Sequence, residues 1–230
     1  MSTPFTGDRK EPLVSPLAAI EDRFIRALLP RFPRWVRGDH LTWMTVAWSL
    51  GVVLSGWLAR SDVRWLWLSS AMLVLQWFTD SFDGKLGKLR GLGLRRWGYF
   101  MDHFLDYVFM ACVMGHYAFI TQEPASTLFL ILVPLYGGVE VNSWLEFGAT
   151  GKFRITYGFV GPTEVRLIFV AVNTAIIFAG VGWLEAAMPY VLAVLAIGLI
   201  GIVHGTQRRI RAQDMAEKAQ MDVTTEETIV

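Results

Sequence analysis

Residues 189–203 read PYVLAVLAIGLIGIV, and Tyr190 is the one side chain among them that carries a polar group. The apolar character extends to about residues 188–207, which is the length that a helix needs to cross the hydrocarbon core of a bilayer. The rest of the chain agrees, because 53% of its 230 residues are hydrophobic and a further 21 are glycine. In soluble domains these classes together average about 45–50%. The sequence therefore predicts an integral membrane protein.

Five more apolar runs precede this one, so we expect six membrane-spanning helices. The runs cover residues 41–60, 64–80, 98–120, 127–147, 164–184 and 188–207. This composition excludes disorder, a collagen-like repeat and a secreted disulfide scaffold. The single cysteine, Cys112, lies in the third run and is interpreted as a small buried hydrophobic residue. The predicted fold class is an all-α integral membrane protein with six transmembrane helices.

The positions of lysine and arginine predict how these helices are oriented. Of the 21 positive side chains, Arg60 and Arg64 stand where the first run ends and the second begins, which is one side of the predicted membrane. The other nineteen fall on the opposite side of the membrane. The nineteen are Arg9, Lys10, Arg23, Arg26, Arg31, Arg34, Arg37, Lys85, Lys88, Arg90, Arg95, Arg96, Lys152, Arg154, Arg166, Arg208, Arg209, Arg211 and Lys218. Because positively charged loops stay in the cytoplasm, both termini are expected there. The net charge of +1 gives no indication of nucleic-acid binding.

The two ends of the chain differ from the six-run core. Residues 1–37 are predicted to form a cytoplasmic tail and an amphipathic juxtamembrane helix, in which Leu17 and Ile20 share an apolar face and arginines occupy the rest. This helix is expected to lie on the membrane surface, to pack on the protein, or to do both. Residues 38–212 form the predicted six-helix domain, and residues 213–230 a polar carboxyl-terminal tail.

Four aspartates stand where the second run ends and the third begins. Asp80 and Asp83 are three residues apart, and Asp102 and Asp106 are four apart, so each pair shares one face of its helix. A tight hairpin between the helices would bring all four carboxylates together near the cytoplasmic surface. Carboxylates this close repel one another, and divalent cations neutralise them. With no Cys or paired His in reach, the oxygen ligands favour Mg²⁺, Mn²⁺ or Ca²⁺ over Zn²⁺.

Glycines and basic side chains surround the four aspartates. Gly84, Gly87 and Gly98 leave space in which a phosphate or a sugar can approach the backbone. Donors to an anionic phosphate are offered by Lys85, Lys88, Arg90, Arg95 and Arg96. For Arg95 and Arg96, ordinary positive charge in a cytoplasmic loop explains the sequence equally well.

The segment from Asp80 to Asp106 resembles the signature of the CDP-alcohol phosphotransferases, also called CDP-alcohol phosphatidyltransferases, which are membrane enzymes of phospholipid synthesis. Their pattern is D-x2-D-G-x2-A-R, eight or nine residues, then G-x3-D-x3-D. Nine residues separate Lys88 from Gly98, so the spacing is met. Gly87-Lys88 replaces the family's Ala-Arg, and lysine keeps the charge but loses the bidentate phosphate geometry of arginine. The six runs and the amphipathic helix are similar to the family's six-helix core and juxtamembrane element.

Two weaker similarities accompany the signature. Residues 38–42, Gly-Asp-His-Leu-Thr, resemble the Pro-Asn-x-Ile-Thr that opens the first helix of the family. Residues 144–146 and 161–164, together with Asp102-His103, are similar to the choline and ethanolamine phosphotransferase branch. That branch uses CDP-aminoalcohols and diacylglycerol, and these residues favour it here.

The resemblance implies a reaction and a role for each residue. The hydroxyl of an acceptor alcohol attacks the β-phosphorus of a CDP-alcohol, a phosphodiester forms and CMP leaves. The implied ligands of two Mg²⁺ or Mn²⁺ ions are Asp80, Asp83, Asp102 and Asp106, and Asp106 is also the implied catalytic base. The implied CDP-binding residues are Asp39, Thr42, Asp80, Asp83, Gly84, Gly87, Lys88 and Gly98. His103 is a less favoured base, because it points about 100° away from Asp102 around the helix.

Other polar residues in or beside apolar runs are candidates for binding the acceptor, because intramembrane acids usually serve a function. These are Glu140, Asn142, Glu164 and Arg166. Glu164 also suits the first turn of a helix after Pro162, where its charge favours the helix dipole. Two substrate pairs stay open: a CDP-aminoalcohol with diacylglycerol, or CDP-diacylglycerol with a small polar alcohol. The resemblance further implies a homodimer, and we expect a bacterial inner-membrane protein whose site faces the cytoplasm.

Two other functions use the same acids. A cation-coupled transporter would employ the carboxylates, but they cluster at one interface rather than at mid-bilayer, and no inverted repeat is visible. A non-catalytic membrane scaffold would hold a structural ion there. Recognition of cytidine nucleotides would separate the enzyme from the scaffold, and a liposome flux that survives Asp106→Asn would favour the transporter.

Overall fold

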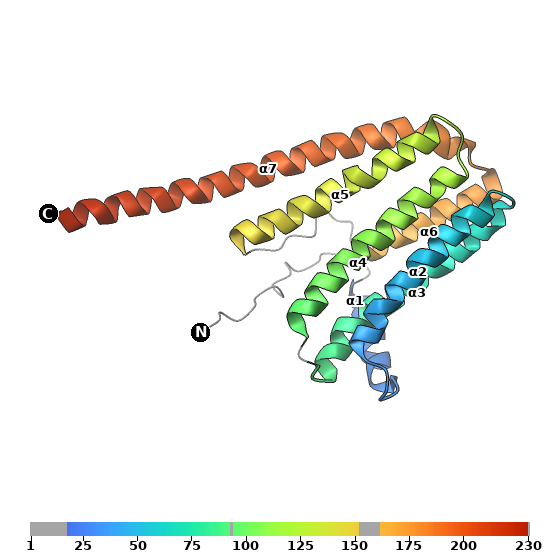
Figure 1. Cartoon of the computed structure of the whole chain (residues 1–230), viewed down its shortest axis with the longest axis horizontal. Helices are drawn as coiled ribbons and strands as arrows, with labels where there is room; N and C mark the ends of the chain where they lie inside the picture. The colour runs from blue at the N-terminus through green and yellow to red at the C-terminus, as the bar shows by residue number, and fades with distance from the viewer. Residues whose placement is uncertain (1–17, 93, 152–161, 230) are drawn as a thin grey trace.

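The computed structural model describes residues 18–92, 94–151 and 162–229, and in these residues it is helical with no strand (Figure 1). The long helices are α1 (Ala18–Leu28), α2 (Gly38–Ala59), α3 (Leu66–Leu89), α4 (Arg95–Gly115), α5 (Ala125–Thr150), α6 (Pro162–Ala179) and α7 (Gly182–Ile229). Three short 3-10 helices are η1 (Leu29–Arg31), η2 (Val63–Trp65) and η3 (His116–Phe119). The predicted all-α class is confirmed. Several residues used in the predictions lie outside the described ranges: Arg9, Lys10, Leu17, Lys152, Arg154 and Gly161.

Helix α2 is the centre of the packing. It contacts α3 and α4, while α3 also contacts α6, and α5 contacts both α4 and α7. One apolar core joins four of these helices, because Val52 of α2, Leu73 of α3, Phe109 of α4 and Ile176 of α6 are all fully buried. Helices α3 and α4 touch each other little, so the polar side chains that face one another between them are not covered by direct helix packing.

A buried polar bridge fixes the position of α6 in this bundle. The Tyr117 hydroxyl of η3 donates a hydrogen bond to Asn173 Oδ1 of α6 at 2.7 Å. The Asn173 amide in turn donates to Ser70 Oγ of α3 at 3.1 Å. Buried polar groups need such partners, since an unpaired one is costly away from water. The bridge therefore sets α6 in a defined register against α3.

Four helices are long and apolar enough to cross a membrane: α2, α5, α6 and the Gly182–Met221 part of α7. Helices α3 and α4 have 24 and 21 residues, a comparable length, but they carry the aspartates and several basic side chains. Large apolar side chains such as Leu50 of α2 and Ile197 of α7 are exposed, as expected of surfaces that contact lipid tails. The chain is thus an integral membrane protein by composition and length, and six spans with cytoplasmic termini stay a prediction.

The carboxyl-terminal end is helical beyond the boundary predicted at residue 212. Helix α7 continues without a break to Ile229, and with the end of α5 it extends past the other helices (Figure 1). Residues 211–221 are exposed, in keeping with the polar composition of this segment. A polar segment forms a helix here because it continues a long helix that is already nucleated.

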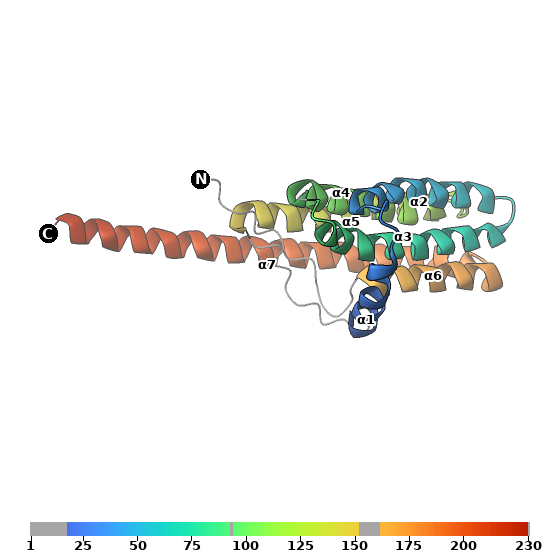
Figure 2. The ribbon, with the colours of Figure 1, turned by 90° about the horizontal axis from the view of Figure 1, so that it is seen from below.

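The amino-terminal helix α1 lies across the direction of the other helices (Figure 2). Its Ile25 is buried against Leu41 of α2 and against Phe82 and Leu86 of α3. Ile20 is 68% exposed. Of the two arrangements expected for this helix, packing on the protein is therefore observed, and contact of its outer face with the membrane surface stays a prediction.

Candidate metal centre

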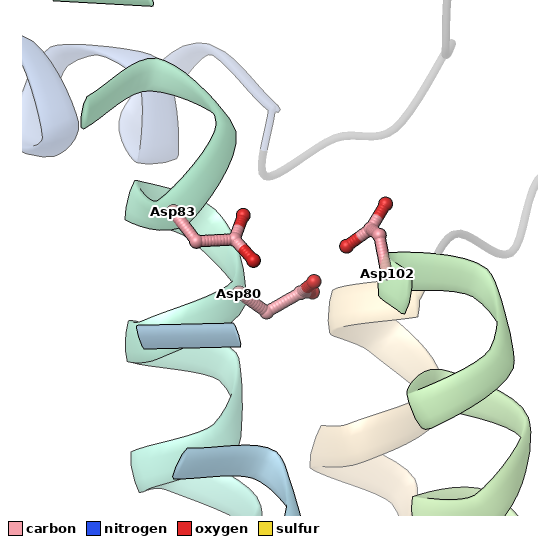
Figure 3. Close-up of side chains that lie close together, drawn as sticks. All are labelled: Asp80, Asp83 and Asp102. Atoms are coloured by element: carbon pink, nitrogen blue, oxygen red, sulfur yellow. The ribbon is translucent and has the colours of Figure 1, made fainter. Parts of the chain in front are cut away.

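Three aspartates from two helices meet at one place. Asp80 and Asp83 lie on α3 and Asp102 lies on α4, and each offers a carboxylate oxygen within 4.8 Å of the other two. Figure 3 shows the two α3 side chains directed toward Asp102. The spacing of three residues places Asp80 and Asp83 on one helix face, which is why a short sequence motif suffices to build half of the cluster.

Contacts from α2 fix the position of Asp83. The Thr42 hydroxyl donates to Asp83 Oδ2 at 2.6 Å, and the backbone N–H of Gly84 donates to Oδ1. At Gly38, an added Cβ would lie 2.4 Å from the Asp83 carbonyl oxygen and 3.0 Å from the Gly87 nitrogen. Because no larger residue fits at Gly38, the start of α2 can lie directly on the α3 backbone. Thr42, predicted to bind the donor, thus contacts a predicted metal ligand.

Arg166 of α6 joins the cluster from the side. Its Nη2 donates to Asp80 Oδ2 at 2.9 Å and lies 3.6 Å from Asp106 Oδ1. Its Nε donates to Gln76 Oε1 at 2.7 Å, and the Gln76 amide donates to Asp106 Oδ1, also at 2.7 Å. Gln76 and Arg166 are buried. A charge-assisted network of this kind holds its members in one geometry.

The structure therefore divides the four predicted ligands. Asp80, Asp83 and Asp102 form the close group, whereas Asp106, one turn after Asp102 on α4, is bonded to Gln76 and lies beside Arg166. Arg166, which the sequence predicts to bind the acceptor, lies next to Asp80 and Asp106, and its acceptor role stays a prediction. His103 Nδ1 lies 3.3 Å from Asp102 Oδ2, and its ring contacts that of Tyr99 in a tilted arrangement with centroids 4.4 Å apart.

Three glycines beside the aspartates face open space. A Cβ added to Gly84, Gly87 or Gly98 would meet no atom of the described residues within 4 Å. Each of the three lies within a helix, where glycine is less favourable than alanine by about 1 kcal/mol. Packing gives no reason for glycine at these positions. The space is therefore available to a ligand, in contrast to Gly38, where the neighbouring helix occupies it.

The other predicted residues lie around this centre or away from it. Asp39 accepts two hydrogen bonds of 2.9 Å from the Arg37 guanidinium. Lys88 is exposed and Glu164 is half-buried. Glu140 shares a hydrogen bond with Tyr136 on its own helix. Asn142 donates to Thr206 of α7 at 3.2 Å. Of the residues predicted to bind the acceptor, Arg166 is brought to the aspartates, and Asn142 contacts α7.

Sequence reasoning missed Gln76 and the pair Glu146–Arg209. Gln76 had a detectable signal, because it is a polar residue in an apolar run and stands four residues before Asp80 on the same helix face. Glu146 is buried and accepts a hydrogen bond from Arg209 at 2.9 Å. Their separation of 63 positions in the sequence gives no local pattern from which the pair could be predicted.

Comparison with known proteins adds one finding. A family model described as CDP-alcohol phosphatidyltransferase matches residues 39–202, which is more than half of the chain. The matched region runs from the first turn of α2 into α7, and it includes the four aspartates, Gln76 and Arg166. No curated protein and no solved structure matches the chain.

Proposed function

Because the chain belongs to the CDP-alcohol phosphatidyltransferase family, we propose that Asp80, Asp83 and Asp102 form the centre at which it transfers a substituted phosphate group. Members of the family are phosphotransferases of phospholipid synthesis that use a CDP-alcohol as donor. In the proposed reaction an acceptor alcohol receives the group and CMP leaves. The observation that carries the proposal is the meeting of three carboxylates from α3 and α4 within the matched region.

The donor set suits Mg²⁺ or Mn²⁺. Both are hard cations that prefer oxygen ligands, and two oxygens on opposite sides of one Mg²⁺ lie about 4.2 Å apart. The carboxylate oxygens of Asp80, Asp83 and Asp102 lie within 4.8 Å of one another, so small side-chain rotations would let them share an ion. We propose two ions, with Asp106 as an additional ligand. When bound, they polarise the attacked phosphoryl group and stabilise the charge on departing CMP.

Asp106 is the proposed base. It would take the proton from the acceptor hydroxyl while the acceptor oxygen bonds to phosphorus and the bond from phosphorus to the CMP oxygen breaks. The Gln76 amide donates to Asp106 Oδ1 and accepts from Arg166 through its own oxygen. Both ends of this amide are therefore committed, which keeps the Asp106 carboxylate in one orientation. Arg166, bonded to Asp80 and close to Asp106, would hold these two carboxylates at a fixed separation.

The donor is proposed to bind over the open glycines. Gly84 and Gly87 on α3 and Gly98 on α4 leave space next to the aspartates, which supports close approach of a diphosphate to the helix backbones. Lys88 in the last turn of α3 and Asp39 in the first turn of α2 are also proposed to contact the donor. Thr42 would act through Asp83, because its hydroxyl orients that carboxylate.

Two substrate pairs remain in the proposal: a CDP-aminoalcohol with diacylglycerol, which the weaker sequence similarities favour, and CDP-diacylglycerol with a small polar alcohol. In both pairs one reactant is water-soluble and one is a lipid. The aspartates lie toward the carboxyl-terminal end of α3 and in the first half of α4, which supports a site at the membrane interface. At that depth the soluble reactant would arrive from water and the lipid reactant from the bilayer. Glu140 and Glu164 are proposed to contact the acceptor, whereas the bond of Asn142 to Thr206 does not favour that role. A cytoplasmic site and a homodimer are part of the same proposal.

Product analysis tests this function. The purified full-length protein in lipid nanodiscs is given Mg²⁺ or Mn²⁺ and a panel of CDP-alcohols and acceptors, and CMP and lipid products are measured. The proposal expects CMP release with at least one pair, and loss of that release in Asp83→Asn. Asp22→Asn is the matched control, because Asp22 pairs with Arg26 on its own helix. Absence of CMP release across the panel, together with metal-driven flux in liposomes that survives Asp106→Asn, would instead support a transporter.

A further inference from the structure

One carboxylate outside the region matched by the family model connects α3, which carries Asp80 and Asp83, with α6, which carries Arg166. Glu21 lies on α1, whereas the matched region begins at residue 39. Its Oε1 accepts a hydrogen bond from Ser81 Oγ of α3 at 3.1 Å. Its Oε2 accepts one from Thr163 Oγ1 of α6 at 2.9 Å. A single side chain thus bridges α3 and α6 from outside the bundle.

Both bonded hydroxyls are adjacent to residues of the metal centre. Ser81 directly follows Asp80, and Thr163 precedes Arg166 by three residues, which is about one helical turn. Arg166 in turn donates to Asp80. The contact between α3 and α6 is therefore held at two neighbouring points, by the Glu21 bridge and by the Arg166–Asp80 ion pair.

The first turn of α6 depends on contacts of this kind. The helix begins at Pro162, and the first four N–H groups of any helix lack partners within it, so a helix start is easily displaced. Thr163 is the second residue of α6 and is tied to Glu21. The tie adds a polar contact to two other attachments of this part of α6: the packing of Val165 on the apolar core and the hydrogen bonds of Arg166 to Gln76 and Asp80.

Helix α1 itself is attached by apolar contacts that do not involve Glu21. Ile25 is buried against α2 and α3. The Phe24 ring stacks on Trp77 of α3 with centroids 5.9 Å apart. Replacing Glu21 would therefore leave α1 in place and remove only the bridge between α3 and α6.

We propose that Glu21 is a positioning residue for the transfer reaction: by holding the first turn of α6 against α3, it sets Arg166 relative to Asp80 and Asp106. This inference rests on the proposed function. Glu21 does not touch the reacting atoms. Small misplacements of a catalytic group lower turnover strongly while leaving substrate binding nearly intact, which gives the proposal a distinct kinetic signature.

The test compares kcat and KM of full-length variants in nanodiscs. Glu21→Ala is expected to lower kcat about tenfold and to change KM for the CDP-alcohol less than twofold, because the donor-binding residues are untouched. Glu21→Gln is expected to restore most of kcat, since its amide has the same length and can bond both hydroxyls. The double variant Ser81→Ala/Thr163→Val should match Glu21→Ala, and adding Glu21→Ala to it should have no further effect. Asp22→Ala, on the same helix, should retain wild-type kinetics.

A second readout does not depend on activity. Hydrogen exchange of peptides covering residues 162–172 should be faster in Glu21→Ala than in the wild type and unchanged in Asp22→Ala. Wild-type exchange in Glu21→Ala, or a kcat equal to that of the wild type, would overturn the positioning role. If the wild type releases no CMP with any substrate pair, the proposed function fails, and the exchange experiment still decides whether Glu21 holds α6.

Discussion

Two charged clusters among the described residues differ in the charges that they bring together. Between α3, α4 and α6, three aspartates of like charge lie within 4.8 Å, with Arg166 at their side. Between α5 and α7, one acid meets one base: Glu146 accepts from Arg209 at 2.9 Å, and Arg209 also donates to Thr206. Both clusters are partly buried, and each joins two helices that are not consecutive in the chain, α3 with α6 and α5 with α7.

The difference in charge indicates a difference in purpose. In an opposite pair such as Glu146–Arg209 the two charges compensate each other, so no cation is needed to neutralise them. Like charges held together repel one another and lower stability, unless a cation binds among them. Accordingly, substitutions in the aspartate cluster should mainly change chemistry, and substitutions in the Glu146–Arg209 pair should mainly change stability.

The largest difference in activity between variants of the two clusters is expected when one carboxylate is neutralised in each. Asp102→Asn should lower CMP release by at least about 10³-fold, because a metal ligand is lost, while thermal unfolding in detergent stays close to that of the wild type. Glu146→Gln should keep CMP release within about threefold. Equal losses of activity in the two variants would remove the distinction between the clusters.

Neutralising the arginine of each cluster should mainly lower activity in the aspartate cluster and mainly lower stability in the Glu146–Arg209 pair. Arg166→Gln is expected to lower kcat about 100-fold, since Asp80 and Asp106 lose a fixed neighbour. Arg209→Gln should leave kcat nearly unchanged and lower the free energy of unfolding by about 1–3 kcal/mol, because the buried Glu146 carboxylate loses its partner. Steady-state kinetics and urea unfolding of both variants check this. An Arg209→Gln protein of wild-type stability would show that the α5–α7 pair is not structural.

A smaller effect is expected from filling the open space beside the aspartates. Gly84→Ala should raise KM for the CDP-alcohol about tenfold and leave stability equal or higher by up to about 1 kcal/mol, because alanine is the better helix former. Gly198→Ala on α7 is the matched control, since its Cβ position also meets no described atom: it should change stability in the same direction and leave KM unchanged. Gly38→Ala should instead destabilise the protein by pushing α2 from α3. An unchanged KM in Gly84→Ala would contradict donor binding over this glycine.

The smallest effect concerns the support of a single ligand. Thr42→Val removes the hydroxyl that donates to Asp83 and should weaken Mn²⁺ binding about fivefold with the fold intact. In Thr174→Val the lost hydroxyl bonds a carbonyl of its own helix, at Val170, so Mn²⁺ affinity should stay at the wild-type value. Isothermal titration calorimetry measures both, and equal affinities in the two variants would separate Thr42 from the metal centre.

The half of the centre on α3 and α4 was predictable because it is local. Asp80 and Asp83 share a helix face through their spacing alone, and the same holds for Asp102 and Asp106. The apolar runs also predicted the positions of six long helices, since runs of this length are a strong sequence signal of a membrane protein. The aspartates and the glycines beside them could be predicted from a segment of about 27 residues, from Asp80 to Asp106.

The remaining parts depend on how distant helices pack. Arg166 lies 86 residues from Asp80, and only the docking of α6 on α3 reveals that they pair, so the sequence could not predict this contact. Asp106 was grouped with the other ligands by spacing, but its bond to Gln76 depends on the rotation of α4 relative to α3. The bridge made by Glu21 spans 142 residues to Thr163 and leaves no pattern in the sequence.

Manganese binding measured by electron paramagnetic resonance tests the central claim most directly. The wild-type protein in nanodiscs is titrated with Mn²⁺ in the presence of CDP, beside Asp83→Asn, Asp102→Asn and Glu146→Gln. The account predicts saturable binding in the wild type and in Glu146→Gln, and at least a tenfold loss of affinity in each aspartate variant. Mn²⁺ affinity that is the same in all four proteins would contradict it.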